Sequence, residues 1–114
     1  MEVKMNLQKI KTLVSQGESK TLEFKKSTAQ LFAAFETVCA FLNGEGGIVL
    51  IGITDNGKII GQDVSDNTKQ AIAHEIAKLE PPAHIDVQYL KLKNGKTINS
   101  TGKRKALVWF INKS

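Results

Sequence analysis

Apolar and polar positions recur along the chain with two different periods, and each period predicts a type of element. Residues 6–17, NLQKIKTLVSQG, carry apolar side chains at helical spacing up to a terminal glycine, so we predict a short amphipathic helix. In residues 21–26, TLEFKK, Leu22 and Phe24 alternate with charged residues, which predicts a strand. Residues 30–43, QLFAAFETVCAFLN, are apolar on nearly all sides and predict a buried helix.

The middle of the chain predicts a central strand followed by a hairpin and a third helix. Residues 48–53, IVLIGI, form a continuous apolar run of strand formers. Asn56-Gly57 predicts a two-residue turn that returns the chain into a partner strand over residues 58–61. Residues 65–82 open with capping residues, carry apolar side chains at helical spacing and end in two prolines.

The C-terminal third predicts further strands. Residues 84–93 form one strand, in which the apolar positions change phase between Tyr89 and Leu90, and this change predicts a β-bulge. A short strand over 96–99 and a central strand within 105–112, KALVWFIN, follow. The order α-β-α-β-β-α-β-β-β predicts an α+β fold, with a mostly antiparallel sheet and two to three helices packed against it.

Composition bounds the class of protein. The 114 residues suit a single domain over 1–114, and a hydrophobic share of 41% is ordinary for a folded protein. The chain has no apolar run long enough to span a bilayer and no signal-peptide pattern at its start, so we expect a cytoplasmic protein without membrane contact. The single cysteine, Cys39, lies in an apolar segment and is expected to be a buried structural thiol.

The net charge of +5 is unevenly distributed. Residues 87–114 contain seven Lys or Arg and no Asp or Glu. This asymmetry is typical of proteins with an anionic partner, of which nucleic acid is the commonest, but a solvated basic surface without a partner gives the same pattern.

The glycine-rich segment NGEGG follows a predicted helix and precedes a predicted strand, which is the reverse of the order in a phosphate-binding P-loop. A tight turn between the helix and the strand explains Gly44, Gly46 and Gly47. Free backbone amides in such a turn would still let a phosphate approach.

Charged residues around the first predicted strand form the strongest candidate for chemistry. Glu23 and Lys25 share one face, and an acid-x-Lys pair on a strand recurs in metal-dependent nucleases. Glu18 has the wrong parity for that face and joins it only if residues 17–21 form a turn. Asp55 follows the central strand, where loops commonly carry function. A solvated charge pair and a turn-forming aspartate are the plain alternatives.

Three blocks of the sequence resemble a known family. ESKTLEFKKS, then VCAFLNGEGGIVLIGITDNGKIIG, then a helix ending in proline with a strand like KALVWFIN, together resemble the Schlafen AlbA-type DNA-binding domain over about residues 17–112. The resemblance implies an α+β lobe that binds nucleic acid. In the Schlafen branch it also implies a metal-dependent endoribonuclease, whose three carboxylates correspond here to Glu18, Glu23 and Asp55.

The resemblance has two departures. Family members usually continue past INKS into a proline-containing loop and another strand, so we expect either the N-terminal piece of a longer regulator or a last strand supplied by a partner. The Schlafen core also joins two lobes into a cleft, whereas this chain holds one, so a cleft would require a homodimer.

We therefore expect a nucleic-acid-binding module (DNA or RNA), most simply the DNA-binding domain of a transcriptional regulator, that needs no cofactor for binding. Low aromatic content, 6%, argues against base stacking as the main contact. The alternatives are a Mg²⁺- or Mn²⁺-dependent nuclease with Lys25 facing the phosphate, and a protein-interaction domain that dimerises through an open sheet edge. The residues expected to meet nucleic acid are Lys25, Lys26, Gly46, Gly47, Lys91, Lys93, Lys103, Arg104 and Lys105.

Overall fold

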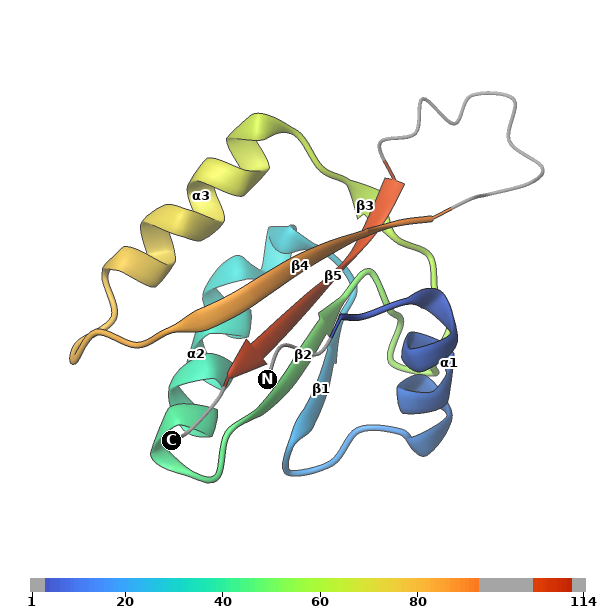
Figure 1. The fold of residues 1–114 in the computed structure, drawn as a ribbon, viewed down its shortest axis with the longest axis horizontal. Coiled ribbons are helices and arrows are strands. Elements are labelled where there is room, and N and C mark those ends of the chain that lie inside the picture. The colour runs from blue at the N-terminus through green and yellow to red at the C-terminus, as the bar shows by residue number, and fades with distance from the viewer. Residues whose placement is uncertain (1–3, 93–103, 112–114) are drawn as a thin grey trace.

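The computed structural model describes residues 4–92 and 104–111. Within these ranges a five-stranded sheet is combined with three α-helices and one 3₁₀-helix (Figure 1). In chain order the elements are α1 (Leu7–Gln16), β1 (Leu22–Lys25), η1 (Thr28–Gln30), α2 (Leu31–Asn43), β2 (Gly47–Ile51), β3 (Gln62–Asp63), α3 (Asp66–Ala77), β4 (Ile85–Lys91) and β5 (Arg104–Ile111).

The sheet is mixed but mostly antiparallel, which confirms the predicted α+β class. β1 and β2 run parallel, joined by η1 and α2, as a parallel pair requires a crossover connection. β5 is antiparallel to β2, β3 and β4. β2 and β3 pair with successive stretches of one edge of β5, while β4 occupies the other edge. β5 is therefore the central strand, as its apolar sequence predicts.

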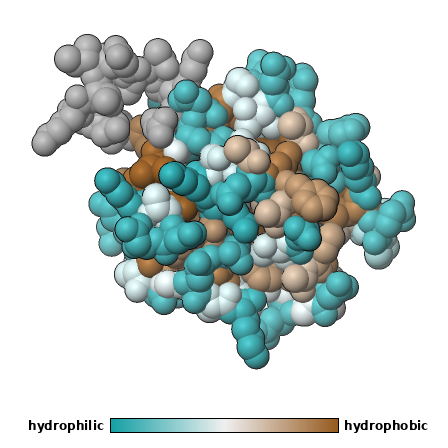
Figure 2. All heavy atoms as spheres, turned by 180° about the vertical axis from the view of Figure 1, so that it is seen from behind, coloured by the Kyte–Doolittle hydropathy of each residue, from teal (hydrophilic) through white to brown (hydrophobic). Residues whose placement is uncertain are grey.

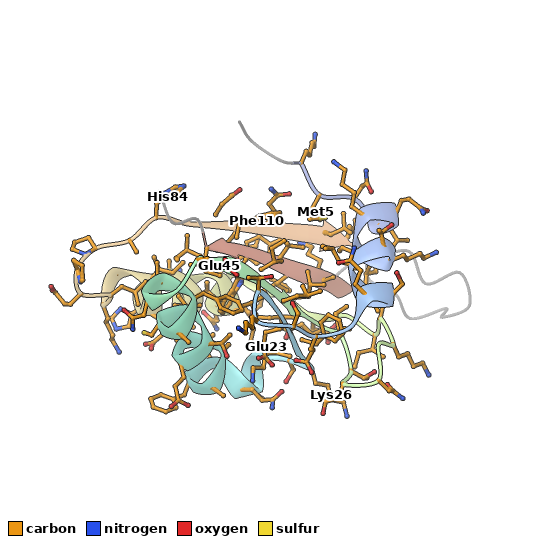
Figure 3. The ribbon with its side chains drawn as sticks, turned by 90° about the horizontal axis from the view of Figure 1, so that it is seen from below. Met5, Glu23, Lys26, Glu45, His84 and Phe110 are labelled. Atoms are coloured by element: carbon orange, nitrogen blue, oxygen red, sulfur yellow. The ribbon has the colours of Figure 1, made fainter. Side chains whose placement is uncertain are left out.

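Helices cover both faces of the sheet, and each face has its own core. α2 and α3 pack on one face around the fully buried Trp109, whose ring centroid lies 5.0 Å from that of Phe35. α1 packs on the other face, where Ile10 joins Leu22 and Phe24. Figure 3 shows α1 and α2 on opposite sides of the sheet. Leu22 and Phe24 thus anchor β1, as predicted, and their neighbours in the strand face α2.

The predicted helix ends are confirmed for α1, and the start is confirmed for α3. Asn6 caps α1 by accepting from the Lys9 amide at 2.8 Å, and Gly17, at φ 77°, ends it. The Ser65 hydroxyl accepts from the amide of Thr68, the third residue of α3. α3 ends at Ala77, earlier than predicted, because the prolines at 81 and 82 disfavour helical backbone ahead of them.

The loop after β2 differs from the predicted two-residue turn at Asn56-Gly57. The Gly57 amide donates to Thr54 O and the Thr54 amide to Lys58 O, both at 2.9 Å. Asp55 and Asn56 are therefore the central residues of the turn, and Gly57 follows at φ 86°. No described residue other than glycine has positive φ, whereas the predicted turn would have required it at Asn56. The return segment makes one bridge, Ile53 to Ile59, instead of a full strand.

The predicted bulge in β4 is wrong. Residues Ile85–Lys91 pair one to one with Ile111–Lys105, without an inserted residue. Tyr89 packs against the core under α2 and α3, whereas Leu90 packs against the core under α1. Successive side chains of β4 still point to opposite faces of the sheet. Two adjacent residues are apolar because both faces are covered by helices at this point.

Two predictions about α2 need correction. The helix is not buried on all sides, because Phe32 is 78% exposed, and the thiol of Cys39 is exposed instead of buried. Helical geometry leaves one side of an outer-layer helix in solvent, whatever its sequence. The predicted strand over 96–99 lies outside the described residues. In the described part of the chain, no helix has both the length and the apolar character needed to cross a membrane.

Candidate nucleic-acid interface and carboxylate pair

The register of the sheet brings separate basic segments of the sequence to one end of the molecule. Lys25 ends β1 and pairs with Ile51 at the end of β2, which in turn pairs with Leu107 near the start of β5. Lys91 ends β4 and pairs with Lys105. Residues 25, 91 and 105 are far apart in sequence, yet they lie at the same end of the sheet.

Strand alternation also places these three lysines on one face. Ile51, Leu107 and Tyr89 all belong to the core under α2 and α3. Lys25 pairs with Ile51. Lys105 lies two residues before Leu107 in β5, and Lys91 lies two residues after Tyr89 in β4. The lysines therefore share the α2 and α3 face, at its rim.

Two further lysines extend this basic end. Lys26 follows β1 and is exposed, and Figure 3 shows it on the α2 side of the sheet, opposite Met5 and Phe110. Lys69, in the first turns of α3, has its ammonium 5.1 Å from the centroid of the Tyr89 ring. We call Lys25, Lys26, Lys69, Lys91 and Lys105 the basic end.

The lysines of the basic end are available for a ligand. The only salt bridge between described side chains is Lys78–Glu75, at the far end of α3. Of the other predicted contact residues, Lys93 and Lys103 lie outside the described residues. Arg104 is described only as the first backbone residue of β5, opposite Asp63.

A tight turn before β1 brings Glu18 to the strand, as its predicted role requires. The Ser19 amide donates to Leu22 O at 2.9 Å, and the Thr21 amide donates to Ser19 Oγ at 3.2 Å. The Glu18 carboxylate then accepts from the Phe24 amide at 3.0 Å. Glu18 thereby reaches past the turn to β1 and lies beside Glu23.

The two carboxyl groups share a hydrogen bond and titrate as a pair. The hydrogen bond with Glu23 lowers the pKa of Glu18, with further help from the Phe24 amide and Lys25. Burial, followed by the hydrogen bond and charge of Glu18, raises the pKa of Glu23 from 4.5 to about 7. The raised pKa of Glu23 and the lowered pKa of Glu18 favour a protonated Glu23 beside an ionised Glu18, as is usual for close carboxyl groups.

Asp55 lies near this pair without joining it. Its charge contributes to the raised pKa of Glu23. The part of the chain that the structure describes nevertheless has no group of three or more His, Cys, Asp or Glu side chains placed to hold a metal ion. The geometry brings together two of the three predicted carboxylates, and as it stands it does not fit a three-carboxylate metal site.

Asp55 instead lines a hollow of about 390 Å³ between the hairpin and the start of α2. Its other lining residues are Lys26, Ser27, Gln30 and Thr54. The hollow adjoins the basic end through Lys26.

The glycines after α2 are explained by local structure. The Gly44 and Gly46 amides both donate to Phe41 O, at 3.1 and 2.9 Å, and Gly46 has φ 88°. A Cβ on Gly47 would lie 2.7 Å from the Phe41 ring. These observations account for the predicted tight turn. Phosphate contact at Gly46 and Gly47 stays a prediction, and we leave it out of the interface proposed below.

Sequence reasoning missed two residues of interest. Lys69 sits on a helix whose position over β4 no local pattern reveals. Phe32 belongs to an apolar segment that predicts burial, and only the packing of α2 shows that it is exposed.

One comparison with known proteins bears on these features. The family model described as Schlafen, AlbA_2 matches residues 18–112. The match includes the carboxylate pair, the hairpin and the strands that form the basic end.

Proposed function

The chain belongs to the Schlafen AlbA_2 family, which suggests a nucleic-acid-related function, and from this premise we propose that it is a nucleic-acid-binding module. Its ligand lies across the basic end and is held mainly through phosphates. The most economical biological role is the DNA-binding domain of a transcriptional regulator.

The observation that carries the proposal is the convergence of Lys25, Lys91 and Lys105 at one end and on one face of the sheet. These lysines lie on three different strands and form no salt bridge with a described side chain, although Lys25 also interacts with the charges of the Glu18–Glu23 pair. A rim of fixed cations matches a phosphate backbone, and binding releases the counterions of the nucleic acid.

Charge reversal tests this proposal. We expect Lys26→Glu/Lys91→Glu to weaken binding to a fluorescent duplex and to reduce the log-log salt slope by about 2, since each lost phosphate contact removes about 0.9. Lys20→Glu is the matched control, because Lys20 is exposed and precedes β1 at the opposite end of the sheet. Equal losses in both variants, or an unchanged salt slope in the double variant, would reject an interface at the basic end.

A metal-dependent nuclease is the second candidate, and the carboxylate pair favours it, because a carboxyl group with a strongly raised pKa is typical of functional sites. Mg²⁺ or Mn²⁺ would be the metal, with Glu18, Glu23 and Asp55 as ligands. This would require Asp55 to approach the pair, which the described geometry does not show.

Cleavage assays separate the two candidates. Duplex DNA, single-stranded DNA and tRNA are incubated with the protein in Mn²⁺ or EDTA. Cleavage that Glu23→Gln and Asp55→Asn both abolish would establish the nuclease, whereas salt-sensitive retention without cleavage supports the binding module. Light scattering on the same samples tests whether the chain forms a homodimer, as a two-lobe cleft, or pairing through the edge of β4 that does not contact β5, would require.

A further inference from the structure

Phe32 is the most exposed large apolar side chain that the structure describes. It is 78% exposed, whereas Phe24, Phe35 and Phe41 are at most 7% exposed. Figure 2, which views the molecule from behind Figure 1, shows hydrophobic side chains reaching a surface that is otherwise largely hydrophilic. A single exposed phenylalanine is unremarkable by itself. Its meaning depends on what surrounds it.

The hollow beside the start of α2 supplies that context. The Lys26 amide donates to Gln30 Oε1 at 3.3 Å, and the two N–H donors of the Gln30 side chain make no hydrogen bond within residues 4–92 and 104–111. The Asp55 carboxylate supplies acceptors, and the Lys26 ammonium supplies a positive charge. Donors, acceptors and a cation in one hollow match the polar edge of a base together with its phosphate.

Gln30 and Phe32 lie two residues apart at the junction of η1 and α2. Side chains at this spacing point to different sides of a helical turn, so one small ligand cannot fill the hollow and cover the phenyl ring. Neighbouring nucleotides of a flexible strand can do both, because each base is free to turn separately about the backbone. In a duplex the bases are paired and stacked, and none is free to lie on Phe32.

We propose that the basic end continues into a binding site for single-stranded nucleic acid, with Phe32 as the stacking platform for one base. The neighbouring nucleotide lies in the hollow, where Gln30 and Asp55 meet its base edge and Lys26 meets its phosphate. The site rests on the proposed nucleic-acid binding and specifies its substrate class as unpaired strands. One stacked base is consistent with the sequence expectation that stacking is not the main contact.

The test compares a labelled single strand with the duplex of the same sequence by fluorescence anisotropy. We expect Phe32→Ala to weaken single-strand binding by about 10-fold, because it removes the aromatic ring on which one base stacks. Phe32→Leu should lose nearly as much, and Phe32→Tyr should bind like the wild type. Duplex binding should be unchanged in all three variants. Since Phe32 is exposed, these variants should keep the wild-type melting temperature.

Leu7→Ala is the matched control, because Leu7 is exposed on α1, on the other side of the sheet. Unchanged single-strand binding by Phe32→Ala, an equal loss on duplex, or wild-type binding by Phe32→Leu would each overturn the stacking site. So would a shift from dimer to monomer in Phe32→Ala without a loss of binding, which would assign Phe32 to a protein contact. If Lys26→Glu/Lys91→Glu binds every nucleic acid like the wild type, the proposed function itself fails. If the wild type binds duplex and the Phe32 variants bind the single strand as tightly as the wild type, only the stacking site is rejected.

Discussion

Removing the carboxyl group of Glu23 should change how the stability of the protein depends on pH. In the folded chain the Glu23 pKa is about 7, against an ordinary value of 4.5. Between these two values the folded state retains a proton that the unfolded state has released. The free energy of unfolding must therefore fall as pH rises from about 4.5 to 7, and the folded state is least favoured once Glu23 is ionised.

The size of the effect follows from the environment of the pair. A fully shielded group with this pKa difference would lower the free energy of unfolding by about 3 kcal/mol. Glu23 is only half-buried, so solvent screens its charge, whereas the lowered pKa of Glu18 changes the free energy of unfolding only below pH 4.5, outside this range. We therefore expect a net decrease of about 1 kcal/mol between pH 5 and pH 8.

Urea unfolding followed by circular dichroism at pH 5, 6.5 and 8 measures this slope. Glu23→Gln keeps the shape of the side chain and cannot ionise, so it should remove most of the decrease and be more stable than the wild type at pH 8. Glu36→Gln, on the exposed side of α2, controls for the loss of one negative charge. An identical pH slope in the wild type and Glu23→Gln would refute the assignment of a shared proton to this pair.

The remaining predictions concern backbone contacts, a cap, an unsatisfied donor and ligand binding. Gly52→Ala should lower the free energy of unfolding by about 2 kcal/mol or more, because its Cβ would lie 2.8 Å from Gly61 Cα and its φ is +99°. Ser65→Ala should cost about 1 kcal/mol through loss of the α3 cap. Trp109→Phe should change the free energy of unfolding by less than about 1 kcal/mol. The packing that is lost is offset by removal of a buried N–H that has no hydrogen-bond partner among the described residues. These three are measured by urea unfolding. Nucleic-acid affinity should fall from pH 6 to pH 8 as the pair near Lys25 gains charge, and anisotropy should show a smaller fall in Glu23→Gln.

Local chemistry made most of the elements predictable from the sequence. The period of apolar residues defines α1, β1, α2 and β5, Gly17 marks where α1 ends, and capping residues define where α3 begins. The errors came where tertiary packing decides the outcome. The phase change at Tyr89 and Leu90 has no local cause, because it records which helix covers which face of the sheet.

The candidate site was predictable only in part, for the same reason. Strand parity separated Glu18 from Glu23, and the turn at Ser19 brings them together. The sequence identified the basic residues. It did not show that they lie at one end of the sheet, because that depends on the register of β1, β2, β4 and β5. Exposure of Phe32 depends on which side of α2 meets the sheet, and an apolar helix carries no strong signal for that choice.

The two glutamates differ in what they contribute to the fold, and this difference separates structural from functional explanations. The Glu18 carboxylate accepts from the Phe24 amide, and with the Ser19 bridge it occupies the edge of β1 that faces away from β2. An exposed strand edge invites pairing with other chains, so the fold alone accounts for an acceptor at position 18. Glu23 makes no such edge contact, and burial together with the carboxyl groups of Glu18 and Asp55 opposes its ionisation more than Lys25 favours it. A carboxyl group kept where it lowers stability at neutral pH is better explained by a ligand than by the fold, so Glu23 is the more informative target for the assays above.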